Sequence, residues 1–218
     1  MESYNFITLG IDCQPTFALK QLDLRKYALP FDWLTSNANM TVECIKDDFK
    51  FFHKELKFDS NNVLCDKYGF GFAHDYPLKK EGEPAPVDNW MDYNADVIEK
   101  YERRIKRFND ILNSDTPIIA IYKGPKEDIQ YFKQIFQEKY NKTNIVYIIY
   151  GYTIIYDYTA NKPNENKERH IEEIIIDNDI VLCNPFDRFI DTFDKSTGIT
   201  IFSNAVDIGK KILQQNFS

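Results

Sequence analysis

The sequence predicts an α/β fold, a three-layer sandwich with a mostly parallel central sheet. Two apolar runs, at residues 117–122 and 144–150, are separated by an amphipathic segment at residues 125–139. Uninterrupted apolar strands joined by a helix are typical of a parallel sheet that is covered on both faces. With 218 residues, 43% of them hydrophobic, the chain can bury one substantial core, so we expect a single domain over residues 1–218.

The N-terminal part of the chain begins with a predicted buried strand at residues 5–9, which breaks at Gly10. A helix is expected at residues 15–22, because Pro15 lacks only an N–H that the first helical turn does not use. Residues 27–29 are expected to form a short second strand before the turn at Pro30.

The middle of the chain predicts two helices and an extended segment. Residues 41–57 carry a helical apolar stripe with Thr41 as N-cap, and residues 90–113 form the strongest predicted helix. Residues 63–74 alternate as an extended segment or hairpin, and residues 78–88 have the charge and proline content of an exposed loop.

The C-terminal third gives a coarser prediction. Strands are expected at residues 153–158, 180–183 and 199–202, and residues 171–176 fit either a strand or a helix. A polar loop is expected at residues 160–169. The chain is expected to close with a helix at residues 204–215, with Asn204 as N-cap.

Composition excludes several classes of function. A net charge of -7 argues against nucleic acid as the main partner. The four cysteines have no paired C-x-x-C spacing and the chain has no glycine-rich phosphate loop, so we expect neither a metal nor another cofactor. No apolar run reaches the ~18 residues of a membrane span, and the N-terminus has no secretory pattern. We therefore expect a cytoplasmic protein with reduced thiols that does not bind a membrane.

Cys13 is the first candidate nucleophile, because it lies where the first strand passes into the first helix. Unpaired backbone N–H groups and the helix dipole at such a terminus favour the thiolate over the thiol. The alternative is a small buried residue that fills a strand-to-helix corner.

A cysteine nucleophile needs a base, which is usually a histidine oriented by a carboxylate or an amide. His53 is predicted on a helix flank and His170 lies in a charged run, which leaves His74 at a predicted strand end. Either of two carboxylates is a candidate to orient His74. Asp75 is adjacent in the chain, and Asp32, between two aromatic rings, is expected either to cap a helix or to have a specific hydrogen-bond or cationic partner.

Several blocks of the chain resemble the DUF1796 family, described as papain-like cysteine peptidases of bacteria and large DNA viruses. The similar blocks lie within residues 5–150 and read Leu9-Gly-Ile-Asp-Cys13, Leu24-Arg25, Pro30-Phe-Asp-Trp-Leu34, Phe72-x-His-Asp-Tyr76 and Tyr101-Glu-Arg-Arg-Ile-Lys-Arg-Phe108. The resemblance implies Cys13 as nucleophile and His74 as its partner. It also implies a papain-like α+β fold as the alternative architecture, and the host cytoplasm as the location if the protein is viral.

The leading functional hypothesis is a cysteine hydrolase that acts on a protein or an acylated substrate, with host proteins among the candidates. One alternative is a non-catalytic interaction module on the same scaffold. A second is an enzyme similar to SGNH hydrolases, because Gly10-Ile-Asp-Cys13 resembles their Gly-Asp-Ser block, although Lys167 stands where their Asp-x-x-His motif needs aspartate. The basic residues Arg103, Arg104 and Arg107 are interpreted as a solvated helix face, with phosphate recognition as a lower-ranked reading. The sequence does not specify an oligomeric state.

Overall fold

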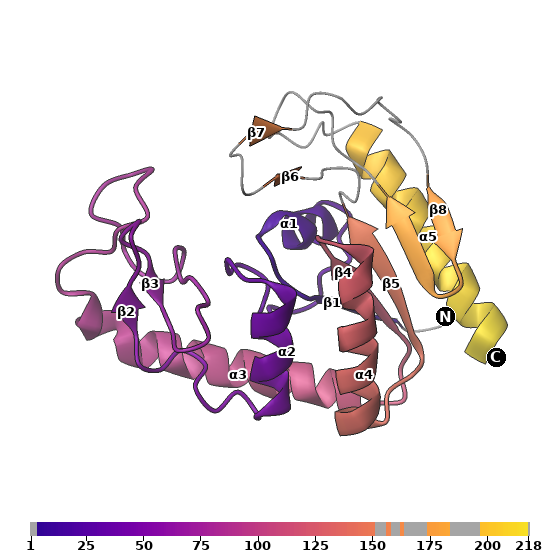
Figure 1. The fold of residues 1–218 in the computed structure, drawn as a ribbon, viewed down its shortest axis with the longest axis horizontal. Helices are drawn as coiled ribbons and strands as arrows, with labels where there is room; N and C mark the ends of the chain where they lie inside the picture. The colour runs from indigo at the N-terminus through magenta and orange to yellow at the C-terminus, as the bar shows by residue number, and fades with distance from the viewer. Residues whose placement is uncertain (1–3, 151–155, 158–161, 164–173, 184–196, 218) are drawn as a thin grey trace.

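A computed structural model describes residues 4–150, 156–157, 162–163, 174–183 and 197–217 of the chain (Figure 1). The helices are α1 (Gln14–Gln21), α2 (Ala38–Lys46), α3 (Asn94–Asn113), α4 (Ile129–Tyr140) and α5 (Thr197–Phe217), with short 3-10 helices η1 (Trp90–Tyr93) and η2 (Lys126–Asp128). The strands are β1 (Asn5–Thr8), β2 (Lys57–Phe58), β3 (Leu64–Cys65), β4 (Ile118–Tyr122), β5 (Ile145–Tyr150), β6 (Tyr156–Asp157), β7 (Lys162–Pro163), β8 (Ile175–Asp177) and β9 (Ile180–Cys183).

The central sheet has five strands in the order β1-β4-β5-β9-β8. Strands β1, β4, β5 and β9 run parallel, with Ile7 opposite Ala120 and Ala120 opposite Tyr147. Strand β8 pairs with β9 in the antiparallel direction at the edge. The predicted α/β class with a mostly parallel central sheet is therefore confirmed.

Helices cover both faces of this sheet, which makes three layers (Figure 1). Alternate residues along each strand enter two separate cores, as the two-residue period of a strand requires. On β5, for example, Tyr147 faces the core shared with α2, α3 and α4, whereas Ile148 faces the core shared with α1 and α5. Both faces are buried, which explains the unbroken apolar runs in the sequence.

The core on the α3 side is rich in aromatic rings. Phe31 has its ring centroid 5.7 Å from that of Phe49, 5.6 Å from that of Phe70 and 5.4 Å from that of Phe108. These rings come from four segments that are distant in the chain. Aromatic contacts of this kind fix the irregular segment between α2 and α3 against the helical layer.

The first correction to the sequence prediction concerns the helix expected at residues 41–57. Helix α2 begins earlier, with Asn37 as N-cap accepting a hydrogen bond from the N–H of Met40, and it ends at Lys46. Asp48 and Phe49 have φ of 61° and 60°, a left-handed conformation that stops the helix. The apolar stripe continues beyond Lys46 because the loop that follows is also buried.

Other predicted elements differ in type or extent. Residues 199–202 lie in α5 and not in a strand, so Asn204 is inside a helix and is not its N-cap. The strand predicted at residues 27–29 does not form. Within residues 63–74 only β3 is a strand, paired with β2, and residues 175–177 of the ambiguous segment form β8. Most of residues 153–158 and 160–169 lie outside the described residues.

The predicted long helix at residues 90–113 is confirmed as η1 followed by α3, and the segment at residues 125–139 is confirmed as η2 followed by α4. No helix in the described ranges is long and apolar enough to cross a membrane.

Candidate active site

Cys13 lies on a tight turn between β1 and α1, at the carboxyl edge of the parallel sheet. The N–H of Leu9 still donates to the carbonyl oxygen of Ile121 in β4, at 3.0 Å, and the chain then turns through Gly10 and Ile11. Ile11 has φ of 80°, a conformation that is strained for a β-branched residue. Cys13 then occupies the N-cap position of α1. Strain of this kind persists only where the surrounding structure holds it, and it is concentrated at functional sites.

Ser36 holds this strained turn in place. Its hydroxyl accepts a hydrogen bond from the N–H of Ile11 at 2.8 Å, and its own N–H donates to the carbonyl oxygen of Ile11 at 3.1 Å. Gly10 has φ of 95°, and a Cβ atom there would lie 2.2 Å from the Ser36 hydroxyl oxygen. Glycine is therefore required at this position both for the backbone conformation and for the approach of Ser36.

Three polar side chains surround the half-buried Cys13. The Asp12 carboxylate accepts a hydrogen bond from the backbone N–H of Gln14 at 2.9 Å. Lys123, which follows β4, donates both to the Asp12 carboxylate and, at 2.6 Å, to the side-chain oxygen of Gln14. Neither Lys123 nor Gln14 was predicted as a site residue, although both follow strands whose carboxyl ends meet at one edge of a parallel sheet.

The thiol of Cys13 is not activated in this structure. Burial raises its pKa, and the neighbouring Asp12 carboxylate raises it further. The N–H of Cys13 itself and the Lys123 ammonium lower the pKa, but by less than the first two groups raise it. Burial, and after it the negative charge that Asp12 places at this helix terminus, therefore oppose the expected stabilisation of the thiolate.

His74 is exposed on a turn that follows the buried Phe72. Its ring centroid lies 6.5 Å from that of Trp33, in an edge-to-face arrangement. Two backbone contacts connect its segment to the turn of Cys13. Thr35 forms a β-bridge with Gly71, and the N–H of the next residue, Ser36, donates a hydrogen bond to Ile11. Within the described part of the chain, however, the structure contains no hydrogen bond between the Cys13 thiol and the His74 imidazole.

Asp32 has partners other than His74. One carboxylate oxygen accepts hydrogen bonds from Arg25 at 2.8 Å and from the N–H of Leu29 at 2.9 Å, and the other accepts from the Thr8 hydroxyl at 2.7 Å. The carbonyl oxygen of Asp32 also accepts from the Thr16 hydroxyl at 2.7 Å, which ties this loop to α1. Of the two alternatives for Asp32, a helix cap or a specific hydrogen-bond or cationic partner, the structure shows the second, with Arg25 as the cation.

Asp75 is also engaged elsewhere. Its nearly buried carboxylate accepts hydrogen bonds from the Lys100 ammonium at 2.6 Å and from the Tyr101 hydroxyl at 2.7 Å. These contacts fix the turn of His74 against α3. Neither Asp32 nor Asp75 bonds the His74 ring in this structure.

His53 is buried, which corrects its predicted place on a helix flank. Its Nε2 lies 2.8 Å from the Tyr76 hydroxyl, which donates to the side-chain oxygen of Asn94 at 3.0 Å. Its ring contacts those of Phe72, Tyr76 and Tyr101. Burial lowers the pKa of His53 to about 4, so this imidazole is neutral near pH 7 and supports the segment that carries His74. His170 lies outside the described residues.

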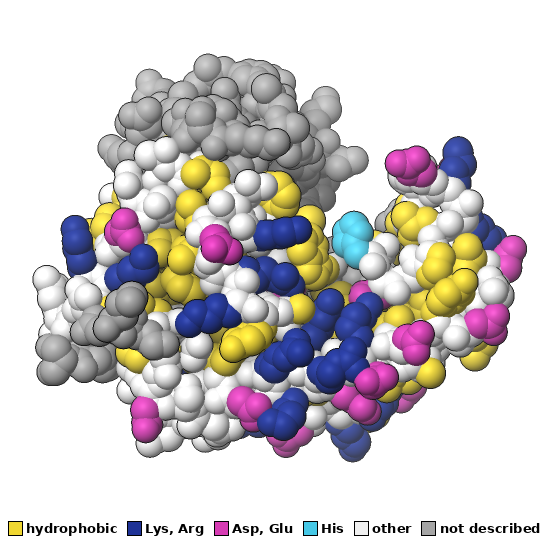
Figure 2. All heavy atoms as spheres, turned by 180° about the vertical axis from the view of Figure 1, so that it is seen from behind, with side chains coloured by type: hydrophobic (Ala, Val, Ile, Leu, Met, Phe, Trp, Pro, Cys, Tyr) yellow, Lys and Arg dark blue, Asp and Glu magenta, His cyan; other side chains and the backbone are white. Residues whose placement is uncertain are grey.

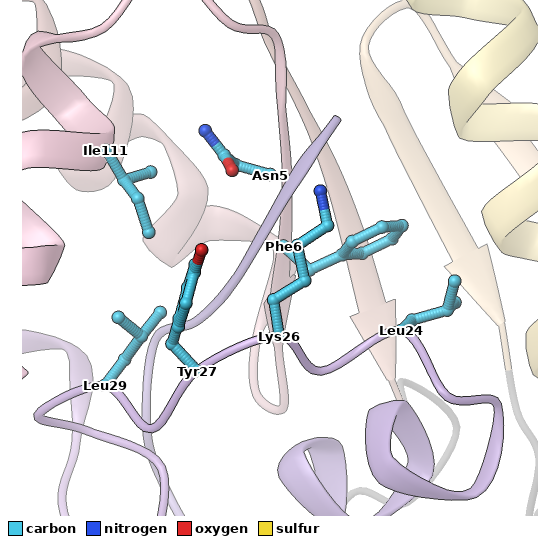
Figure 3. A pocket seen from close by; sticks show the side chains of 7 residues that line it. All are labelled: Asn5, Phe6, Leu24, Lys26, Tyr27, Leu29 and Ile111. Carbon is cyan, nitrogen blue, oxygen red and sulfur yellow. The ribbon is translucent and has the colours of Figure 1, made fainter. Parts of the chain in front are cut away.

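The remaining thiols and the pocket beside β1 do not suggest a second site. Cys44, Cys65 and Cys183 are free thiols, and the described residues contain no cluster that could hold a metal ion. A small pocket beside β1, lined among others by Phe6, Tyr27 and Ile111, has room for about 10 Å³, no more than one water molecule (Figure 3).

Comparisons with known proteins connect these residues to a family. The sequence profile of a family described as "Putative papain-like cysteine peptidase (DUF1796)" matches residues 4–150. An uncharacterized protein, R408, of Acanthamoeba polyphaga mimivirus is 29% identical over 140 residues, which cover 53% of this chain and 60% of that protein. No solved structure matches this chain. The family match contains Cys13, Asp32, His74 and Asp75, and it ends at the last residue of β5.

Proposed function

Because the chain belongs to the DUF1796 family, we propose that it is a cysteine-dependent hydrolase with Cys13 as nucleophile and His74 as general base and acid. The observation that carries this proposal is the strained turn that places Cys13 at the carboxyl edge of the sheet. Ligands of open α/β sheets bind at this edge. Amide or isopeptide bonds of a protein are the first choice of substrate, and esters or thioesters are the second.

The proposed reaction has two stages. In the first, the Cys13 proton moves to His74, the sulfur forms a bond to the acyl carbon, and the C–N bond breaks as His74 returns the proton to the leaving amine. In the second, His74 takes a proton from water, the hydroxide attacks the thioester, and the C–S bond breaks. The carboxylic acid leaves and Cys13 recovers its proton.

The oxyanion of the intermediate needs hydrogen-bond donors beside Cys13. The first two residues after Cys13 do not supply a free backbone donor, because the N–H of Gln14 is bonded to Asp12 and Pro15 has none. We assign this role to the Cys13 N–H and to the side-chain amide of Gln14. Since Lys123 holds the amide oxygen of Gln14, the NH₂ group is left to donate.

His74 has to approach Cys13 before the reaction starts. Catalytic hydrogen bonds are often long in a ligand-free enzyme and form only in the substrate complex. His74 is exposed and its ring has no hydrogen bond in the described residues, so a substrate that packs on Trp33 can move the imidazole without breaking one. The raised pKa of Cys13 then protects the resting thiol from side reactions.

A second candidate function is a non-catalytic interaction module. The missing hydrogen bond between Cys13 and His74 and the raised pKa of the Cys13 thiol both favour it. On this reading Cys13 is a corner residue and the chain binds a protein partner, in the cytoplasm of a host if the chain is viral.

Turnover of a small panel of peptide amides and peptide thioesters separates the two functions. We expect Cys13→Ala to abolish release of the amine or thiol, and Cys65→Ala, at another half-buried thiol whose pKa burial raises, to leave the rate unchanged. Equal turnover by the wild type and Cys13→Ala would overturn Cys13 as the nucleophile, and turnover by neither would support the interaction module.

A further inference from the structure

Helix α3 presents a row of cations on the face beside the turn of His74. Lys100, Arg104 and Arg107 follow the helical spacing i, i+4 and i+7, so they lie on one side over two turns. We call these three residues the α3 cation row. Figure 2 shows Lys and Arg side chains gathered over this helix, at the border of a hollow between the body of the molecule and the β2–β3 region.

The two arginines of the α3 cation row have no carboxylate partner among the described residues. Arg104 instead lies over the ring of Tyr101, with its guanidinium carbon 5.0 Å from the ring centroid, and Arg107 lies 5.9 Å from that of Tyr27. The Nη1 atom of Arg104 is buried, and no described residue offers it a hydrogen-bond acceptor. A buried donor of this kind is unfavourable unless it finds an acceptor, so a carboxylate that reaches this guanidinium would relieve the unpaired donor.

The neighbouring ion pairs turn their positive members outward. In the pair of Lys100 with Asp75, the lysine side chain is 29% exposed and the carboxylate 3%. In the pair of Arg25 with Asp32, the arginine is 20% exposed and the carboxylate 3%. Arg25 also lies 5.7 Å from the ring centroid of Trp33, which contacts His74. A ligand in this region therefore meets cations and aromatic rings, while the compensating carboxylates lie below the surface.

The local distribution of charge favours a short acidic peptide over a nucleic acid. The α3 cation row spans about 10 Å at 1.5 Å of rise per residue, and the same helix carries exposed Glu99, Glu102 and Asp110 on its other faces. A nucleic acid would extend its closely spaced phosphates beyond this row, over the surface of a protein with a net charge of -7. One or two carboxylates of a peptide match the row without this repulsion.

We propose that the α3 cation row, together with Arg25 and Trp33, binds an acidic segment of the polypeptide substrate. This inference rests on the proposed hydrolase function, and it adds a substrate class: a polypeptide with Asp or Glu residues close to the bond that is cleaved. Arg104 and Arg107 hold the carboxylates, while the adjoining backbone passes Trp33 toward His74.

Binding is measured on the Cys13→Ala protein, so that it does not depend on chemistry. We expect a short fluorescein-labelled Glu-rich peptide to bind more tightly than its Gln-substituted counterpart, by fluorescence anisotropy, with affinity that falls as salt rises. Arg104→Gln combined with Arg107→Gln should weaken binding about tenfold or more. Arg107→Gln alone should cause a smaller loss of affinity for the Glu-rich peptide, because this variant retains the partly buried Arg104. The matched control is Lys106→Gln, at an exposed residue of α3 that pairs with Asp110, and it should leave binding unchanged.

Equal affinity for the Glu and Gln peptides would overturn the proposal, as would tighter binding of a single-stranded oligonucleotide of the same charge. With the wild-type protein, a Glu-containing substrate should have a lower KM than its Gln counterpart, and the double variant should remove that difference. Selective binding of the Glu peptide without any cleavage would support the α3 cation row as a binding surface for acidic peptides, and it would contradict the proposed hydrolase function.

Discussion

Cys13 and His74 belong to two regions that are stabilised in different ways. Cys13 is presented by the parallel sheet, where β1, β4 and β5 are held by buried apolar side chains on both faces. His74 is presented by the irregular segment between α2 and α3, where buried polar groups replace regular hydrogen bonding. Asp66 alone accepts hydrogen bonds from the backbone N–H groups of His53, Tyr68, Gly69 and Phe70.

This difference indicates how the two halves of the candidate site respond to change. The sheet region depends on apolar packing, which pH hardly affects. The His74 region also depends on the contacts of Asp75, and on Asp66 and His53, two groups whose pKa is shifted by burial. Perturbation of these groups should therefore disturb the histidine side of the site and leave the Cys13 turn in place.

The largest effect is expected at Asp32, which lies at the boundary between the two regions. Asp32→Ala removes the partner of Arg25 and leaves the N–H of Leu29 without its acceptor, so the free energy of unfolding should fall by about 4 kcal/mol. Urea denaturation measures this change. A loss of turnover in Asp32→Asn without loss of stability would instead assign Asp32 a direct role with His74.

Asp66→Ala should cause the next largest loss of stability. Three of the four backbone N–H groups lose their acceptor in a buried loop, while that of Gly69 keeps the carbonyl oxygen of Asp66, and the free energy of unfolding should fall by about 3 kcal/mol. Asp59 is a matched control, because it also accepts backbone N–H groups, from Asn61 and Val63, but in an exposed loop. If Asp59→Ala lowers the free energy of unfolding as much as Asp66→Ala, the distinction between a buried and an exposed carboxylate that accepts backbone N–H groups is wrong.

His53 makes the stability of its region depend on pH. Burial lowers its pKa to about 4, below the 6.5 of an unfolded histidine, so between these pH values the unfolded chain binds more protons. The contribution of His53 is complete above pH 6.5 and is lost as pH falls toward 4, by about 3 kcal/mol. The stability difference between wild type and His53→Gln should shrink accordingly over this range.

The comparison with His53→Gln isolates this effect. Burial raises the pKa of Asp66 to about 6, and this group acts in the opposite direction, but it is common to both proteins and cancels in the difference. Ile148→Val, in the sheet core, should cost about 1 kcal/mol at every pH. A stability difference between wild type and His53→Gln that does not change with pH would contradict the account of His53.

The smallest effect is expected at Lys123. Since its ammonium lowers the pKa of the Cys13 thiol, Lys123→Gln should slow iodoacetamide labelling of Cys13 several-fold at fixed pH. Lys126→Gln, at an exposed lysine paired with Asp177, serves as the control. Mass spectrometry of the labelled peptide gives both rates. Faster labelling in Lys123→Gln would contradict the claim that Lys123 lowers the pKa of Cys13.

The sheet and the long helix could be predicted from the sequence because each follows one period. Residues 118–122 and 145–150 are apolar without interruption, and α3 has its apolar residues on one face. The end of α2 could not be predicted in the same way. Asp48 and Phe49 adopt left-handed conformations without any glycine, and the buried ring of Phe49 packs on Phe31 and Phe108, which come from distant parts of the chain.

The candidate site was predictable only in part. The position of Cys13 followed from a strand that ends at glycine before a helix. The burial of His53 did not, because the rings that enclose it, from Phe72, Tyr76 and Tyr101, come from segments distant in the chain. The role of Asp66 had a weak signal, since an aspartate three residues before Gly69 is typical of a turn.

Acyl transfer to Cys13 tests the central claim most directly. An activated peptide ester is added to wild type and to His74→Ala, and the acylated residue is located by mass spectrometry, with iodoacetamide labelling at high pH as a measure of thiol access. We predict rapid acylation at Cys13 that is strongly reduced in His74→Ala, while iodoacetamide labels Cys13 equally in both. Equal acylation in the two proteins, or acylation of Cys65 as fast as Cys13, would contradict the proposal that Cys13 and His74 act together.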